Sequence, residues 1–114
     1  MNIDKKIIDG VVVFKVKSLR VDASVVDNLK TEVSKEIVES AKIILDLNEV
    51  DYMDSTSLSV LVFFYKEAKQ KGAQFRIVTN NEKILSIFIT TGLIRALEIN
   101  RDFDEAIKEI KDGS

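Results

Sequence analysis

Three hydroxyl residues follow an acidic residue near the middle of the chain. Asp54 comes first, and Ser55, Thr56 and Ser57 follow it directly. Asp, Ser and Thr are the preferred residues at the N-cap of a helix, where a side-chain oxygen accepts a backbone N–H. One cap needs one such residue, so the run exceeds what capping requires. The run also follows a predicted strand and opens a predicted helix, a position where binding sites of α/β sheets tend to lie.

The acidic residues around this run offer a second kind of chemistry. Asp46, Asp51 and Asp54 lie near one predicted loop, and carboxylates of this kind are ligands for Mg²⁺. Acidic residues near a loop are more often simply solvated. A nucleotide-binding protein or small hydrolase would also need a glycine-rich phosphate loop, and the four glycines are scattered along the chain.

The chain contains no histidine and no cysteine. It therefore lacks the side chain that titrates near neutral pH and the commonest transition-metal ligand. It also has no thiol for disulfide or thiolate chemistry, which fits a reducing cytoplasm. We expect a protein that is not an enzyme and that holds no cofactor and no metal.

Composition predicts one domain over residues 1–114, with 46% hydrophobic residues to build its core. The net charge is −2 with both signs interspersed, whereas nucleic-acid binders usually carry a basic stripe. The longest apolar run, Val60 to Tyr65, is far too short to span a bilayer. The first residues do not resemble a signal peptide. We expect a cytoplasmic protein with no nucleic-acid or membrane partner.

Hydrophobic periodicity predicts a mixed, mainly parallel sheet of about five strands with four helices, in the order β-β-α-β-α-β-α-β-α. Asp9-Gly10 between two β-branched runs predicts a hairpin that adds an antiparallel edge. Residues 43–47 are apolar apart from Asp46 and predict a central strand buried on both faces. The other predicted strands are 7–8, 11–16, 75–78 and 97–99. The first predicted helix carries Val26 to Ile37, and the second runs from 56 to 71. The third extends from Asn80 or Asn81 to near Gly92, and the fourth starts at Asp102.

A helical wheel of the second helix divides its apolar residues between two sides. Val60 and Phe63 fall on the same side as Thr56, opposite the face that should meet the sheet. We expect both to be at least partly exposed and to form a contact surface; the alternative is that a neighbouring helix covers them. The residues expected to face the sheet are Leu58, Leu61, Val62, Tyr65 and Ala68.

Four landmarks resemble one family. The strand 45–47 followed by 50–58, which ends in Asp-Ser-Thr-Ser-Leu, is similar to the signature of STAS domains, specifically the bacterial anti-sigma factor antagonists. Val21-Asp22-Ala23 resembles the Leu-Asp-Ala of the family, and Thr91-Gly92-Leu93 its Thr-Gly-Leu. Residues 103–106 resemble the start of its final helix. The sequence departs from the family pattern at Ser57 and Ser59, where the family has glycine.

This resemblance implies a switch made of protein partners. An anti-sigma factor with a serine/threonine kinase domain would phosphorylate the second hydroxyl after the aspartate, which is Thr56, with Ser55 and Ser57 as fallbacks. The unmodified protein would bind the anti-sigma factor and free the sigma factor, and a phosphatase would reset the switch. We expect Ser55 to be inward or capping, because helix N–H groups need acceptors there.

The residues expected to contact the partner surround Thr56. They are Asp22, Asp54, Ser55, Ser57, Val60 and Phe63. We expect a monomer or weak dimer. The alternative hypothesis within the same family is that the chain is a STAS protein that is never phosphorylated and serves as a scaffold, in a stressosome-like or transport-associated assembly.

Overall fold

The computed structural model describes residues 3–112. Its main sheet contains β1 (Ile3–Ile8), β2 (Val11–Val16), β4 (Lys42–Asp46), β6 (Gln74–Val78) and β7 (Ile99–Asn100). The spatial order is β1-β2-β4-β6-β7. β1 pairs with β2 antiparallel, and the other neighbouring strands are parallel. The predicted mixed, mainly parallel sheet with an antiparallel edge is confirmed.

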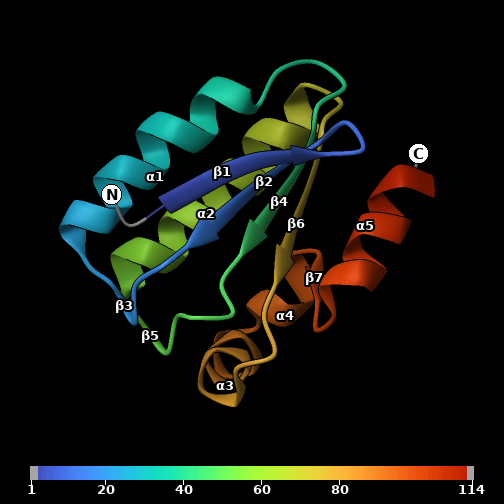
Figure 1. Ribbon diagram of the computed structural model, residues 1–114. Coiled ribbons are helices and arrows are strands. Elements are labelled where there is room, and N and C mark those ends of the chain that lie inside the picture. The colour runs from blue at the N-terminus through green and yellow to red at the C-terminus, as the bar shows by residue number, and fades with distance from the viewer. Residues whose placement is uncertain (1–2, 113–114) are drawn as a thin grey trace.

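Strand β4 lies in the middle of this sheet, between β2 and β6 (Figure 1). Its residues Ile43, Ile44 and Leu45 are fully buried. Ile43 and Leu45 belong to the hydrophobic core on one face, and Ile44 belongs to the core on the other. An apolar run without alternation is what a strand covered on both faces requires. The prediction of a central strand here is confirmed.

Helices cover both faces of the sheet. They are α1 (Ala23–Glu36), α2 (Ser55–Gln70), α3 (Glu82–Thr91), α4 (Leu93–Ala96) and α5 (Phe103–Asp112). Figure 1 shows α1 and α2 on one side of the sheet and α5 on the other. The larger core lies under α1, α2 and α3, and the smaller one under α5, where Ala106 and Ile110 are buried. The four predicted helices are present, and α4 is an additional single turn. No helix in the described range is long and apolar enough to cross a membrane.

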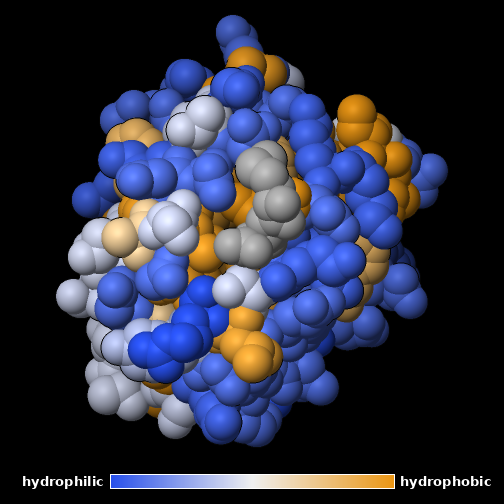
Figure 2. Space-filling view, turned by 60° about the vertical axis from the view of Figure 1, so that its left-hand side comes forward, coloured by the Kyte–Doolittle hydropathy of each residue, from blue (hydrophilic) through white to orange (hydrophobic). Residues whose placement is uncertain are grey.

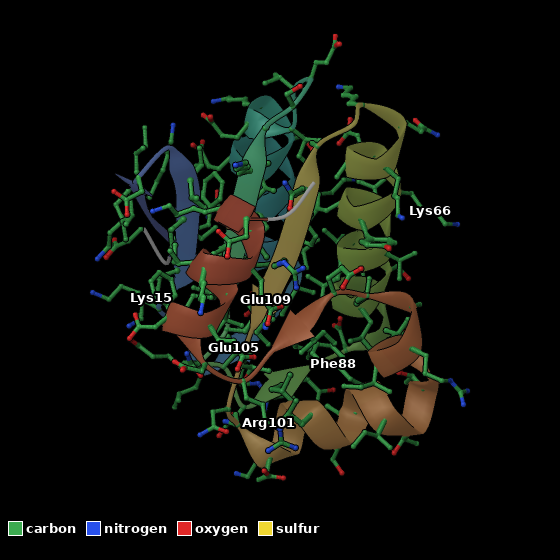
Figure 3. The ribbon with its side chains drawn as sticks, turned by 90° about the vertical axis from the view of Figure 1, so that its right-hand side faces the viewer. Lys15, Lys66, Phe88, Arg101, Glu105 and Glu109 are labelled. Atoms are coloured by element: carbon green, nitrogen blue, oxygen red, sulfur yellow. The ribbon has the colours of Figure 1, made fainter. Side chains whose placement is uncertain are left out.

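A polar network adds to the apolar contacts that hold α5 on the sheet. The Nδ2 of Asn100 donates hydrogen bonds to Glu105 and Glu109 at 3.1 and 3.2 Å. A guanidinium nitrogen of Arg76 lies 3.1 Å from the Oε1 of Glu109. Figure 3 labels the two glutamates on α5, which crosses in front of the sheet in that view. The network therefore ties α5 to β6 and β7, on the face opposite α1 and α2.

The predicted hairpin joins β1 to β2. Asp9 and Gly10 both have positive φ angles, 51° and 80°, as a type I′ turn requires. Ile8 pairs with Val11 on either side of the turn. The Asp-Gly signal is therefore confirmed.

Two very short strands form a second sheet that the sequence pattern does not predict. β3 (Arg20–Val21) and β5 (Tyr52–Met53) pair in parallel, where the sequence predicts neither a strand nor a helix. The position of the last strand is also corrected. It is Ile99–Asn100 rather than 97–99, because the N–H of Leu97 donates to the carbonyl of Leu93 and closes α4.

Candidate functional site

The first residues of α1 and α2 lie next to each other because the small β3–β5 sheet precedes both helices. Arg20 pairs with Tyr52, and Val21 pairs with Met53. Each strand leads within two residues into a helix, so the two helices begin side by side (Figure 1). The hydroxyl run at the start of α2 is therefore placed beside the start of α1, although about thirty residues separate them in the chain.

Asp54 is the N-cap of α2. Its Oδ1 accepts a hydrogen bond from the backbone N–H of Ser57 at 2.8 Å and another from the Ser57 hydroxyl, also at 2.8 Å. These two hydrogen bonds favour the ionised carboxylate, so they hold the pKa of Asp54 below its usual value. The capping role predicted for this region is therefore filled by the aspartate.

Ser57 is the inward-facing hydroxyl of the run. Only 1% of its surface is exposed, and its Oγ lies 2.8 Å from the carbonyl oxygen of Val21 in β3 as well as from Asp54, so the two acceptors share its single hydroxyl proton. The expectation that Ser55 points inward or caps the helix is wrong, because Ser55 is exposed. Asp54 is the N-cap instead. Its carboxylate accepts the backbone N–H of Ser57, three residues later, and the Ser57 side chain lies over the core. Burial also makes Ser57 a poor fallback for modification.

Thr56 is exposed, as the expected modification site must be. It sits in the first turn of α2, between the outward Ser55 and the inward Ser57. The backbone N–H groups of a first helical turn lack partners within the helix and carry partial positive charge. A negatively charged group attached to Thr56 would therefore be near both the helix start and the Asp54 carboxylate.

Asp22 caps α1 in the same manner as Asp54 caps α2. Its Oδ1 accepts hydrogen bonds from the hydroxyl of Ser24 at 2.9 Å and from the N–H groups of Ser24 and Val25 at 3.1 and 3.3 Å. The Ser24 hydroxyl is the main cause that lowers the pKa of Asp22. The site therefore contains two ionised caps, one at the start of each helix.

The two apolar residues expected to be exposed on α2 have different positions. Phe63 is 47% exposed, and the Lys30 ammonium of α1 lies 5.9 Å from its ring centroid. Val60 is only 7% exposed and belongs to the larger core. The expectation that Val60 is exposed is wrong, because α2 packs against α1 as well as against the sheet, and this widens its buried face.

The buried face of α2 differs from the one predicted. Its buried residues are Ser57, Val60, Leu61, Phe64 and Ala68. They follow helical spacing, but the first member is polar, so the hydropathy pattern does not include it. Phe64, which is fully buried, was missing from the predicted face.

Two exposed residues of the site were not predicted. Tyr52 is 42% exposed and Leu19 is 66% exposed. Figure 2, which brings the left-hand side of Figure 1 forward, shows a mostly hydrophilic surface on which hydrophobic atoms form small separate areas. A contact surface on this side therefore depends on single apolar side chains among polar ones. Sequence alone gives no signal for them, since both lie outside the strands and helices predicted from the sequence.

The acidic residues considered as Mg²⁺ ligands are engaged separately. The Oδ1 of Asp46 accepts the N–H of Asn48 at 2.9 Å, and Asp51 lies 3.5 Å from the ammonium of Lys83. Asp54 caps α2. Within residues 3–112, no group of three or more acidic side chains is arranged to hold a metal ion. The geometry therefore gives no support to the magnesium alternative.

Comparison with known sequences identifies relatives. A model of the STAS domain matches residues 2–106. A Thermotoga maritima protein with the provisional name anti-sigma factor antagonist is 36% identical over 70 residues, 61% of this chain and 62% of its own. An anti-sigma-B factor antagonist of Listeria monocytogenes is 33% identical over 64 residues, 56% of each chain. The chain thus matches less than two thirds of the length of these curated relatives.

Solved structures share the fold over almost the whole chain. An anti-sigma factor antagonist from Mycobacterium paratuberculosis superposes with a TM-score of 0.85 at 22% identity, covering 96% of this chain and 93% of its own. The phosphorylated form of SpoIIAA, a cell fate determinant of Bacillus, gives a TM-score of 0.71 at 17% identity, covering 95% and 98%. Together with the match over residues 2–106, this fold shows that the chain belongs to the STAS domain family.

Proposed function

We propose that this chain is an anti-sigma factor antagonist that works by partner switching. In its unmodified form it binds an anti-sigma factor that carries a serine/threonine kinase domain, and the sigma factor is released. Phosphorylation of Thr56 ends the binding, and a phosphatase restores it. The chain itself is a binding protein without catalytic turnover. The observation that carries this proposal is the exposed Thr56 in the first turn of α2, between the N-cap Asp54 and the buried Ser57.

The electrostatics of the site support a switch at Thr56. A phosphate adds about −1.5 to −2 charges and three acceptor oxygens. Asp54 lies two residues before Thr56, and Asp22 caps the neighbouring helix. The start of α2 partly stabilises the phosphate, but the added charge joins two ionised carboxylates on a surface that also contains Phe63. Desolvating this charge against a partner is unfavourable, so phosphorylation should weaken the complex.

The family relationship supports the same proposal. The relatives named above are called anti-sigma factor antagonists, and SpoIIAA, which has the same fold, has been solved in a phosphorylated form. The departures at Ser57 and Ser59 are compatible with partner binding. Ser57 points inward to Val21, and the hydroxyl of Ser59 folds back to the carbonyl of Ser55 at 3.0 Å, so neither side chain needs to extend toward a partner.

The test uses the kinase-type anti-sigma factors encoded in the genome from which this chain comes. Each is purified and incubated with the chain and Mg-ATP, and the products are analysed by mass spectrometry. We expect one phosphate on Thr56 in the wild type and on Ser55→Ala, and none on Thr56→Ala. Phosphate on Ser55 or Ser57 alone would refute the assignment. Binding without any phosphorylation would favour the scaffold reading, in a stressosome-like or transport-associated assembly.

A further inference from the structure

Leu19, Arg20 and Tyr52 form a small exposed surface on the β3–β5 sheet, which we call the β3–β5 platform. The Arg20 guanidinium lies 4.2 Å from the centroid of the Tyr52 ring. The backbone N–H groups of Asp51 and Tyr52 both donate to the carbonyl of Leu19, at 2.8 and 3.2 Å. The Arg20 and Tyr52 side chains are therefore in contact, and the backbone of Leu19 is hydrogen-bonded to the segment that carries Tyr52.

The composition of the platform is unusual for an exposed surface with only a structural role. Leu19 and Tyr52 are 66% and 42% exposed, so neither contributes much to the core. An exposed cation–aromatic pair contributes only about 0.5–1 kcal/mol to folding. Arginine and tyrosine are, however, enriched at the centres of protein interfaces. The platform therefore has the side chains of a contact surface.

The charge of Arg20 has no partner within the described part of the chain. No carboxylate between residues 3 and 112 lies within 4.0 Å of its guanidinium, whereas Arg76 and Arg101 both pair with glutamates. Arg20 thus presents donors to solvent while its position is fixed by stacking on Tyr52. A carboxylate on a partner is the complementary group, since guanidinium and carboxylate form paired hydrogen bonds.

The platform is continuous with the hydroxyl site. The carbonyl of Val21, the residue after Arg20, lies 2.8 Å from the buried Ser57 Oγ, and Tyr52 lies four residues before Thr56. The start of α2 and the platform are therefore fixed relative to each other. A partner that covers Thr56 is placed to reach the platform as well.

We propose that the β3–β5 platform is a second recognition element of this chain, which binds an acidic side chain beside an apolar recess on the anti-sigma factor. This inference rests on the proposed function, because the occupant is the same partner. The stacked Arg20–Tyr52 pair supplies the electrostatic and aromatic anchor, and Leu19 enters the apolar recess. Binding at the platform is independent of the hydroxyl of Thr56, so it persists in a protein that lacks the modification site.

The experiment measures binding to the anti-sigma factor that forms a complex with the wild-type chain, by titration calorimetry. Arg20→Glu and Tyr52→Ala should each weaken binding about tenfold or more, and Leu19→Ser about fivefold. Tyr52→Phe keeps the ring and should stay within about threefold of wild type. Matched controls lie elsewhere: Lys108→Glu on α5 makes a charge reversal like that of Arg20→Glu, and Ile7→Ser on β1 makes a similar polar change at an exposed residue. Both should bind within about twofold of wild type.

The decisive experiment is to restore the binding of Arg20→Glu by reversing a charge on the partner. Each acidic residue on the contact face of the anti-sigma factor is changed to lysine and titrated against Arg20→Glu. Restored binding for one such pair demonstrates the contact, and thermal unfolding of each variant shows that the fold is retained. Wild-type affinity in both Arg20→Glu and Tyr52→Ala would overturn the platform and leave the proposed function standing. Failure of every anti-sigma factor to bind the wild type would overturn both.

Discussion

The Oγ of Ser57 lies 2.8 Å from the carbonyl oxygen of Val21, a residue 36 positions earlier in the chain. The same hydroxyl also lies 2.8 Å from the carboxylate of Asp54. One buried side chain thus joins the start of α2 to the strand that leads into α1. Because Arg20 directly precedes Val21 in the chain, this contact fixes the β3–β5 platform relative to the start of α2, and these are the two parts of the proposed partner surface.

Replacing Ser57 with alanine should destabilise the protein. The Val21 carbonyl and the Asp54 carboxylate would lose the buried hydroxyl donor that they share, and an unsatisfied buried group costs about 1–3 kcal/mol. Urea unfolding measures the change. Ser59→Ala is the matched control, because Ser59 is exposed and two residues further along α2, and its effect should stay within about 0.5 kcal/mol. Equal effects of the two substitutions would contradict the structural role of Ser57.

Val60 and Phe63 should respond to alanine in opposite ways. Val60 is buried in the larger core, so Val60→Ala should lower the free energy of unfolding by about 1–3 kcal/mol. Phe63 is half-exposed, so Phe63→Ala should leave stability nearly unchanged and weaken partner binding by about 1–3 kcal/mol, the range for an interface hot spot. Unfolding curves and titration calorimetry on both variants separate the effects. A large loss of stability in Phe63→Ala would place Phe63 in the core and remove it from the contact surface.

The sequence predicts the parts of this fold that have regular periodicity or strong turn signals. Ile43, Ile44 and Leu45 are consecutive apolar residues, and Asp9-Gly10 matches a type I′ turn, so both the central strand and the hairpin were predictable. The strands β3 and β5 have two residues each, too few for any pattern to develop. The exposed positions of Leu19 and Tyr52 depend on these strands and were missed with them.

The sequence predicts where the hydroxyl run lies, and the structure corrects which of its side chains face inward. The Asp-Ser-Thr run locates the start of α2, and Thr56 is exposed as expected. Which hydroxyl faces inward depends on the rotation of the helix, which is set by packing against α1 and the sheet. The burial of a serine and a valine on α2 reflects this packing, which the hydropathy of a single helix does not contain.

Acidic pH should lower the free energy of unfolding, in part because Asp54 becomes protonated. Hydrogen bonds from Ser57 lower the pKa of Asp54 from its usual value of 3.8 in the folded state. Its stabilising effect is therefore complete above that usual value and is lost as the pH falls through the lower folded-state pKa. Asp54→Asn does not titrate, and its amide oxygen can still accept from the Ser57 N–H. We expect the wild type to be more stable at pH 7 and the difference to shrink below pH 4.

Urea unfolding at several pH values between 7 and 2.5 tests this dependence. Asp22 has a lowered pKa for the same kind of reason, so the double variant Asp22→Asn, Asp54→Asn should show a flatter acid profile than either single variant. A stability difference between wild type and Asp54→Asn that stays constant over this range would show that ionisation of the cap does not contribute.

Substitutions at Thr56 should reproduce the two states of the proposed switch. Thr56→Ala lacks the hydroxyl that accepts the phosphate, so it should bind the anti-sigma factor like the unmodified wild type and stay in that form in the presence of ATP. Thr56→Asp should bind more weakly, because its charge is added beside Asp54 and Asp22. One carboxylate carries less charge than a phosphate, so the weakening should be smaller than that caused by phosphorylation.

Ser55→Asp places the same charge one residue earlier and serves as the positional control. Titration calorimetry with each variant, and with enzymatically phosphorylated wild type, ranks the four affinities. If phosphorylated wild type binds as tightly as Thr56→Ala, charge at this position does not control the complex and the switch mechanism is wrong.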